Sequence, residues 1–421
     1  MSGAEVLLAL LVLTYVGSVL VGGRTIRGFG LPSGAEYLVL GVVLGPHVLG
    51  VVQRSTVMSF ETLFVVAASW LALVSGLGWG IVGRRSIHFG RALVGVVMAV
   101  LVGAAVSFAT YFAFTRLGTF QGRERILWAI AAGSVGCETT RHAVRWVVER
   151  HGTRGPVSDW VADLARSSAI VPVLWIAVMF AMAPDAPLAA FTVPARFGIG
   201  LGIGVVLGLV AAVLLGREFR RDESWGILLG TSLLAAGVAT RLGLAAVATL
   251  FVMGLTLSAV SRHRLEIKLM VQPTEKPMFL PVALVVGAYV DFDAVPKLGW
   301  LVAAALLARV AAELVRGVLL VTFIKPARPA SPTLGLGMLS TGTISLAVAF
   351  SVFVRLPGPA SSTILTIAAA GVLLGEMLGP AFLRRGLDRA GETHVVDDAD
   401  PSPLSMPPPH ALSDHPPEVR E

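Results

Sequence analysis

The sequence predicts an all-α membrane protein that crosses the bilayer many times, and three observations carry this prediction. The chain has 421 residues, of which 55% are hydrophobic and only 14% are charged. Its apolar residues form runs of roughly 20, the length that a helix needs to span the hydrocarbon core. Its basic residues alternate between neighbouring loops in the pattern that fixes the orientation of membrane proteins. Such a composition excludes a soluble globular domain of this size.

Thirteen apolar runs predict thirteen transmembrane helices. The first run has no basic segment before it, which favours a retained helix over a cleaved signal peptide. Only Arg241 and Leu242 separate the eighth run from the ninth. The thirteen runs cover approximately residues 4–22, 35–53, 60–83, 92–115, 126–150, 157–183, 197–216, 225–240, 243–260, 277–291, 298–324, 333–355 and 361–383.

The lysines and arginines predict the orientation of the chain. The loops after odd-numbered helices hold most of them, whereas the other side carries scattered basic residues and the acids Asp185, Asp291 and Asp293. Because basic loops stay in the cytoplasm, we expect an external N-terminus and a cytoplasmic C-terminus, in a bacterial inner (plasma) membrane. The basic residues of the odd-side loops are Arg24, Arg27, Arg84, Arg85, Arg91, Arg150, Arg154, Arg217, Arg220, Arg221, Arg262, Arg264, Lys268, Lys325, Arg328, Arg384, Arg385 and Arg389.

Composition also argues against several functions. The net charge of +7 does not predict nucleic-acid binding, because the basic residues sit in short loops and form no stripe with interleaved aromatic residues. Cys137 is the single cysteine, so no intramolecular disulfide or cysteine metal pair is possible. No nucleophile–base arrangement, phosphate loop or metal motif indicates an enzyme. We therefore expect no cofactor, and the lipid bilayer as the surroundings of the chain.

The C-terminal residues differ from the rest of the chain. From 388 to 421 the sequence is rich in Pro, Asp and His and has no apolar period. Such a segment cannot bury enough apolar surface to fold alone. We expect a transmembrane domain over 1–387 and a disordered cytoplasmic tail over 388–421.

Polar residues interrupt the fifth apolar run. Between Ala129 and Arg154 the chain contains weak helix formers, and Glu138 and Arg141 bring charge to bilayer depth. A charge there costs a few kcal/mol or more, so this segment should face a protein interior or a water-filled cavity. Helices broken at the membrane midplane are how many secondary transporters build their sites. The weak helix formers are Gly133, Gly136, Thr139 and Thr140.

A second break is predicted in the other half of the chain, in the sequence LGLGMLSTGTISLAVAF. Gly and Ser/Thr at this density weaken a helix, and the hydroxyls can satisfy backbone groups that the break frees. Close packing of helices through glycine is the alternative interpretation. The matched position of the two breaks favours a shared site. The residues are Gly335, Gly337, Gly342, Ser340, Thr341 and Thr343.

Several segments in order resemble the monovalent cation–proton antiporter superfamily, which includes the sodium/proton exchangers. Leu31–Val52 resembles the opening signature of that family, and Ala129–Pro156 resembles its unwound fifth helix and following loop. The other segments that resemble it are Phe251–Asp293, Leu334–Phe350 and Leu374–Glu392. The resemblance implies two inverted-topology repeats, here about 1–183 and 225–385, with broken helices five and twelve that cross. It also implies exchange of Na+ or K+ for protons by an elevator-type movement, in a homodimer.

The sequence departs from that family on helix six. Family members carry one or two carboxylates there, which bind the cation and the protons. The corresponding positions here are Ser167 and Ser168, or one residue later. Without the carboxylate, competition of cation and proton for a helix-six acid is not possible, so another residue must supply the negative charge if exchange occurs.

Glu138 is the first candidate for that charge. It lies in the break, where the family usually has a small residue close to the ion, and a carboxylate there could take over cation or proton binding. Alternatively, it neutralises Arg141 three residues along or stabilises the terminus of a half-helix. Thr139 lies beside it and completes this part of the predicted ion site.

Asp163 and Glu313 are the other acidic candidates. Asp163 lies one helical turn before Ser167, but an acid so near the end of a helix more often pairs in solvent, here with Arg166. Glu313 lies four residues after Arg309 and three before Arg316, so this ladder of charges could simply neutralise itself.

Arg309 matches the basic residue of the family on helix eleven, which pairs with the acid of the empty site. Its expected partner here is Glu138 or Glu313. A guanidinium stays charged at any working pH, so Arg309 cannot release the transported proton. Arg141 adds a second permanent positive charge. Two arginines leave two further interpretations open: a transporter of an anion or organic solute held by Arg141 and Arg309, or a membrane sensor or scaffold without transport.

Overall fold

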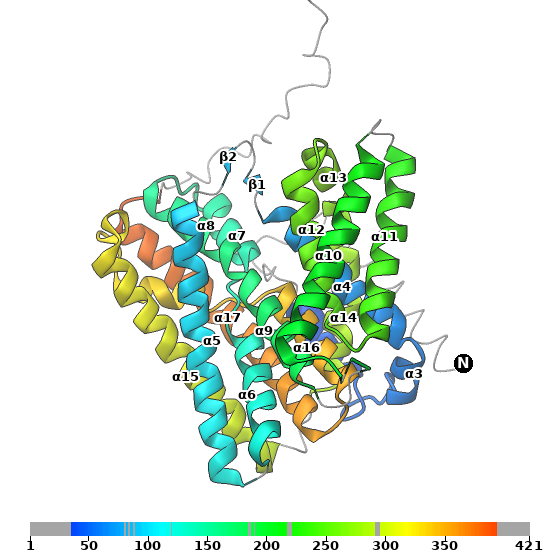
Figure 1. Ribbon diagram of the computed structural model, residues 1–421. Helices are drawn as coiled ribbons and strands as arrows, with labels where there is room; N and C mark the ends of the chain where they lie inside the picture. The colour runs from blue at the N-terminus through cyan, green and yellow to red at the C-terminus, as the bar shows by residue number, and fades with distance from the viewer. Residues whose placement is uncertain are drawn as a thin grey trace, which may run out of the picture.

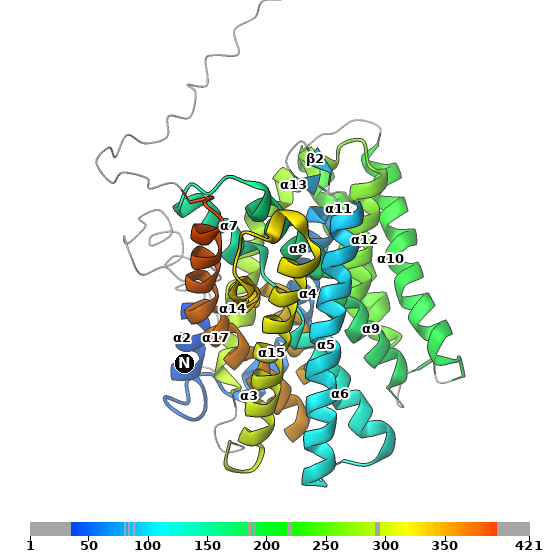
Figure 2. The same cartoon turned by 90° about the vertical axis from the view of Figure 1, so that its left-hand side faces the viewer.

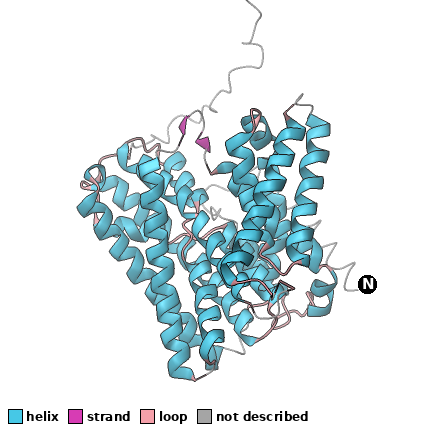
Figure 3. Ribbon diagram, in the orientation of Figure 1, coloured by secondary structure: helices cyan, strands magenta, loops and turns pink. Residues whose placement is uncertain are grey.

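The structure is a computed structural model that describes residues 35–79, 81–82, 85–86, 89–118, 120–183, 187–188, 190–216, 221–290 and 295–393. These residues are almost entirely helical (Figure 3). Two short strands, β1 (Ile81–Val82) and β2 (Arg85–Ser86), pair antiparallel. The predicted span 4–22 lies outside the described residues, as does the predicted tail from 394 onward.

The helices follow the predicted apolar runs. In the first half they are α2 (Ala35–Leu44), α3 (Arg54–Ser59), α4 (Glu61–Gly78), α5 (Phe89–Leu117), α6 (Gly122–Gly136), α7 (Arg141–Arg150), α8 (Pro156–Ser168) and α9 (Ile170–Met182). In the second half they are α10 (Val193–Leu215), α11 (Arg221–Arg241), α12 (Ala246–Val260), α13 (Arg264–Val271), η1 (Gln272–Thr274), α14 (Glu275–Ala288), α15 (Val295–Phe323), η2 (Lys325–Ala327), η3 (Pro332–Met338), α16 (Thr343–Arg355) and α17 (Pro359–Arg389).

Length and apolar character identify the helices that can cross a membrane. Among the described residues five helical spans pass this test, or six when η3 and α16, bent by 53° at their break, count as one. One of the five combines α8 and α9. The chain is therefore a polytopic α-helical membrane protein. The prediction of a helix over 35–53 was too long, because α2 ends at Leu44 and a turn around Gly50, with φ of 64°, leads to α3. The count of thirteen spans stays a prediction.

The helices form two groups that lie side by side in Figure 1, and in Figure 2 the group that contains α5 and α15 faces the viewer. In the first group, α5 packs against α6, α8 and α15, and η3 lies between α15 and α17. In the second, α12 packs against α4, α10 and α11, and α14 packs against α2 and α4. Helices α9 and α16 contact both groups. The two breaks in the chain belong to the first group and face the second.

Glycine allows the closest helix packing in the second group. A Cβ at Gly76 on α4 would overlap the carbonyl of Phe251 on α12, and a Cβ at Gly254 would overlap the carbonyl of Leu73. The two helices therefore touch backbone to backbone, as small residues permit in membrane proteins. This contact holds α4 and α12 together, and Ser75 of α4 lies beside the first break.

The end of the domain lies beyond the predicted boundary at 387. Helix α17 continues to Arg389, and the carboxylate of Glu392 accepts hydrogen bonds of 2.6 and 2.7 Å from the backbone N–H groups of Val157 and Ser158. These are free N–H groups of the first turn of α8, where a negative charge is favourable. Residues 388–393 are thus part of the packed domain, and a composition shift did not mark its end.

Candidate functional site

The two breaks meet inside the protein. Residues 137–140 separate α6 from α7, and residues 339–342 separate η3 from α16. The backbone N–H of Thr140 donates a 2.7 Å hydrogen bond to the carbonyl of Ser340, which joins the two extended segments. A Cβ at Gly342 would lie 2.7 Å from Cβ of Thr140 and 2.8 Å from Oε1 of Glu138, so only glycine fits at this crossing. The predicted crossing of two broken helices is present.

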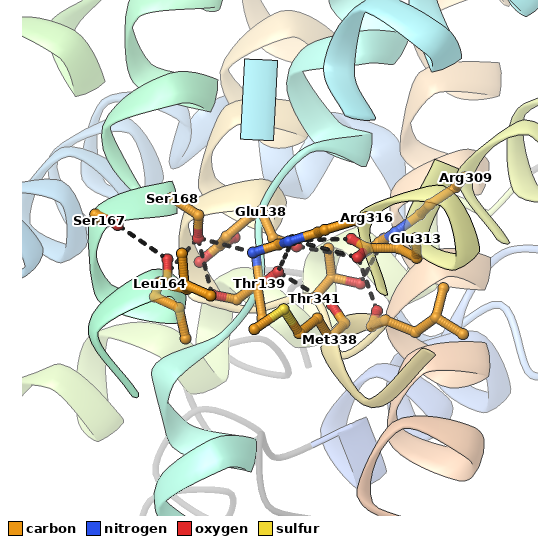
Figure 4. Close-up of polar contacts among 12 residues, drawn as sticks. Glu138, Thr139, Leu164, Ser167, Ser168, Arg309, Glu313, Arg316, Met338 and Thr341 are labelled. Carbon is orange, nitrogen blue, oxygen red and sulfur yellow. Dashed lines mark hydrogen bonds and ion pairs between the residues drawn. The ribbon is translucent and has the colours of Figure 1, made fainter. Parts of the chain in front are cut away.

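Glu138 stabilises the start of α16. Its Oε2 accepts a 2.6 Å hydrogen bond from the backbone N–H of Ser345, in the first turn of that helix. The first N–H groups of a helix have no partner in the helix itself and carry partial positive charge. The carboxylate is only 4% exposed and points across the crossing (Figure 4). It forms no ion pair with Arg141, so the alternative in which the two neutralise each other was wrong.

Arg309 binds carbonyl groups at the C-terminal ends of the broken helices. Its Nη2 donates to the carbonyls of Glu138 (3.0 Å) and Leu339 (2.7 Å), which follow the C-terminal ends of α6 and η3. Its Nη1 donates a 3.0 Å hydrogen bond to Oγ1 of Thr341. Carbonyls at such ends carry partial negative charge, so a guanidinium there is favourable. The sequence predicted that Arg309 would pair with the carboxylate of Glu138 or Glu313. In the structure, Arg309 contacts Glu138 through the backbone carbonyl of that residue.

A buried ion pair lies next to Arg309 on α15. Nη1 of Arg316 lies 3.2 Å from Oε1 of Glu313 and also donates a 3.0 Å hydrogen bond to Oγ1 of Thr139. Thr139 in turn donates to the carbonyl of Met338 at 3.1 Å. Both charged side chains are at most 1% exposed. Figure 4 shows the two arginines and Glu313 grouped on one side of the crossing.

The two helix-six serines face different neighbours. Oγ of Ser168 accepts a 3.2 Å hydrogen bond from the backbone N–H of Thr139 and therefore touches the break. Oγ of Ser167 bonds to the carbonyls of Asp163 and Leu164 in its own helix and packs against Gly95 of α5. Of the two positions where a carboxylate was expected, only Ser168 faces the crossing.

Asp163 and Arg141 have partners that the sequence did not predict. Asp163 pairs with Arg91 of α5 at 3.2 Å instead of Arg166, because helix packing brings α5 alongside α8. Arg141 lies 2.9 Å from Oε1 of Glu275 on α14, and Nε2 of His142 lies 3.0 Å from the same oxygen. Asp163 is thus held away from the crossing, and Arg141 bridges the two helix groups.

The remaining predicted residues line the crossing or its cavity. The Ser340 hydroxyl donates a 3.0 Å hydrogen bond to the carbonyl of Gly375, which fixes the second break against α17. Thr343 and Glu138 line a small cavity of about 10 Å³, enough for one water-sized particle. Its other lining residues are Ser75, Thr139, Thr140, Arg141, His142, Ala165, Arg166 and Ala169.

Sequence reasoning missed two residues of this region. Glu275 was not singled out, although it is an acid at the start of an apolar helix and could have been noticed as such. Arg316 was considered only as a neighbour of Glu313, and its contact with Thr139 depends on how α15 packs against the first break. No group of three or more His, Cys, Asp or Glu residues that could hold a metal occurs among the described residues.

Comparisons with known proteins agree with this architecture. Residues 11–384 match the family described as "Sodium/hydrogen exchanger, transmembrane". The chain belongs to this family. No curated protein sequence matches it.

Solved structures resemble this exchanger-family protein in fold. A structure of the sodium proton antiporter MjNhaP1 from Methanocaldococcus jannaschii at pH 8 has a TM-score of 0.68 and 15% identity, covering 93% of this chain and 99% of that chain. An electron-microscopy map of the same antiporter gives a TM-score of 0.64 and 14% identity, with 92% and 98% covered. At this identity the likeness concerns the fold.

Proposed function

We propose that this exchanger-family protein is a secondary transporter that exchanges a monovalent cation, Na+ or K+, for protons, with Glu138 as the carboxylate that both ligands use. The observation that carries the proposal is the position of Glu138, buried at the crossing of the two breaks and lining a cavity of about 10 Å³. Thr139, Thr343 and Ser75 line the same cavity, so hydroxyl oxygens are at hand beside the carboxylate. Hard cations prefer such oxygen ligands.

Charge balance supports exchange at this site. Glu138, Glu313, Arg309 and Arg316 are all buried, and with both acids ionised their charges cancel. A cation beside Glu138, or a proton on it, adds the same single positive charge. Both together would add two positive charges to a low-dielectric interior, which is costlier than adding one. Cation and proton therefore exclude one another at Glu138, as antiport requires.

The position of the cavity supports an elevator-type movement. Ser75 belongs to α4 in the second helix group, whereas Glu138 and Ala165 belong to the first group. Sliding of the first group along α4 and α12 would carry the cavity across the membrane. Cysteines at Ser75 and Ala165, in a Cys137→Ser background, should cross-link and stop exchange until they are reduced. Exchange that continues in the cross-linked protein would contradict the movement.

Three further parts of the proposal follow from family resemblance and loop charge. They are a homodimer, an external N-terminus with a cytoplasmic C-terminus, and a bacterial inner membrane. We propose no enzymatic activity for this protein. The hypothesis of an anion or organic solute held jointly by Arg141 and Arg309 has less support, because Arg309 donates to three protein oxygens and Arg141 binds Glu275.

The deciding experiment compares Glu138→Gln with Glu149→Gln in proteoliposomes that contain a pH-sensitive dye. Gln keeps the shape of Glu138 and can still accept the hydrogen bond from Ser345, but it cannot carry charge. We expect at least about a hundredfold loss of cation-driven proton movement, in the range of other lost ionisable groups at proton-transfer sites. Glu149 is exposed on α7 and pairs with Arg145, so its variant should exchange normally. Unchanged exchange in Glu138→Gln would refute the proposed role.

A further inference from the structure

A second, larger cavity lies between the two helix groups. Its volume is about 210 Å³, against about 10 Å³ for the cavity at Glu138. Its wall comes from α4, α7, α8, α13, η1 and α14, of which α7, α8 and α13 lie toward the upper end of the molecule in Figure 1. Arg145, whose side chain is 65% exposed, is one of its lining residues, so the larger cavity reaches the surface.

Three side chains lie between the two cavities. Arg141, His142 and Arg166 line both of them. Glu138 lines the smaller cavity, whereas Glu275 lines the larger one. A cation that comes from the larger cavity must therefore pass these three side chains before it reaches the carboxylate of Glu138.

Glu275 holds two of these three side chains in place. Nη2 of Arg141 donates hydrogen bonds of 2.9 and 3.0 Å to the two carboxylate oxygens of Glu275, and Nε2 of His142 lies 3.0 Å from the first of them. Arg141 and His142 begin α7, which packs against α8 and α17 of the first helix group. Glu275 begins α14 of the second group. The contact therefore ties the residues between the cavities to the opposite helix group.

The ends of two helices in the second group favour this ion pair. Arg141 lies against Gly78, the last residue of α4, where a Cβ would come within 2.5 Å of its Nη1. The free carbonyl groups at such a helix end carry partial negative charge, which stabilises a guanidinium. Glu275 is the first residue of α14, where the free N–H groups stabilise a carboxylate in the same way. Gly78 thus leaves the room that Arg141 needs to reach Glu275.

We propose that Glu275 is a gating residue, which holds Arg141 and His142 across the passage between the two cavities and closes the Glu138 cavity in this state. The passage opens when the ion pair breaks. Any sliding of the first group along α4 must break it, because Glu275 and Gly78 stay with the second group. The inference rests on the proposed function only in taking the Glu138 cavity as the cation site.

The test measures how fast a cysteine in the smaller cavity reacts with a small maleimide, in the purified full-length protein in detergent. The reporter is Ala169→Cys in a Cys137→Ser background, because Ala169 lines the smaller cavity. Ala162→Cys is the matched reporter in the larger cavity. We expect Glu275→Gln to accelerate the reaction at Ala169→Cys at least about tenfold, the factor that a lost hydrogen bond to a charged group supplies. The reaction at Ala162→Cys should keep its rate.

Gly78→Ala tests the gate without removing a charge. The atom that its new Cβ would meet is the end of a flexible side chain, so the guanidinium of Arg141 should move away from Glu275 while the fold is kept. We expect the same acceleration at Ala169→Cys. Gly230→Ala on α11 is the matched control, because nothing lies within 4 Å of its new Cβ, and it should leave the rate unchanged.

The unfolding temperature shows whether each variant is still folded. An unchanged rate at Ala169→Cys in a folded Glu275→Gln or Gly78→Ala protein would overturn the proposal. Equal acceleration at Ala162→Cys would also overturn it, because the whole region would then have loosened. The maleimide reaction requires no transport, so a failure of the gate shows in these rates, whereas a failure of the proposed function shows in the exchange of Glu138→Gln.

Discussion

The hydroxyl of Ser168 accepts a 3.2 Å hydrogen bond from the backbone N–H of Thr139. This contact places α8 directly against the first break, at a position where the family resemblance predicts a carboxylate. Ser167, one residue earlier, faces Gly95 of α5 instead. Successive residues of an α-helix point about 100° apart around its axis. Ser168 therefore lies at the site, whereas Ser167 lies in the contact between α8 and α5.

Ser168→Asp should strengthen cation binding. The new carboxylate would lie beside Thr139 and would add a charged oxygen ligand to the site, and affinity for hard cations rises with the charge of the ligands. We expect the cation concentration for half-maximal exchange to fall by about tenfold. The measurement is exchange in proteoliposomes across a range of Na+ and K+ concentrations.

Ser167→Asp is the control for that variant. The contact of Oγ with Gly95 leaves no room for a larger side chain, so this change should lower the unfolding temperature without improving cation affinity. An equal gain in affinity from both variants, or none from Ser168→Asp, would contradict the assignment of register.

Glu313→Gln should destabilise the protein strongly. It leaves the buried guanidinium of Arg316 without its counter-charge, a change that costs about 3–5 kcal/mol in other buried pairs. The unfolding temperature in detergent measures the effect. Glu149→Gln breaks an exposed pair with Arg145 and should cost less than about 1 kcal/mol.

A double variant tests the reason for this effect. Glu313→Gln combined with Arg316→Met removes both charges and should recover much of the lost stability, because no buried charge remains unpaired. If the double variant does not recover stability, Arg316 stabilises the fold mainly through its hydrogen bond to Thr139.

Glu392→Ala should loosen the junction between the end of α17 and the start of α8. It removes two hydrogen bonds of 2.6 and 2.7 Å to free N–H groups of a helix, an effect of about 1–2 kcal/mol at other helix starts. The unfolding temperature should fall, with Glu392→Gln intermediate. Asp388→Ala, which breaks an exposed 3.7 Å pair with Arg384, should have little effect. Equal losses from Glu392→Ala and Asp388→Ala would argue against the capping role.

Local composition was enough to predict the membrane class, most helices and both breaks. An apolar run of about 20 residues has few folded alternatives outside a bilayer, and a cluster of Gly, Ser and Thr weakens a helix wherever it occurs. Glu138 could be selected for the same reason, since a charged residue in an apolar run is conspicuous, whereas Arg309 and Ser168 were selected only through their match to positions of the family. The predicted end of the domain at 387 was wrong. Glu392 is one polar residue in a polar segment, and its contact with α8 makes it part of the domain.

The sequence by itself determined that the chain is helical, where its helices weaken and which charges lie at membrane depth. Only the tertiary structure decided the partners of those charges. Arg141 binds Glu275, 134 residues away, and Asp163 binds Arg91, 72 residues away. Spacing along one helix predicts contacts three or four residues apart. Contacts between helices depend on how each helix is rotated and on where the backbones can approach, as at Gly342, and these follow from packing of the whole molecule.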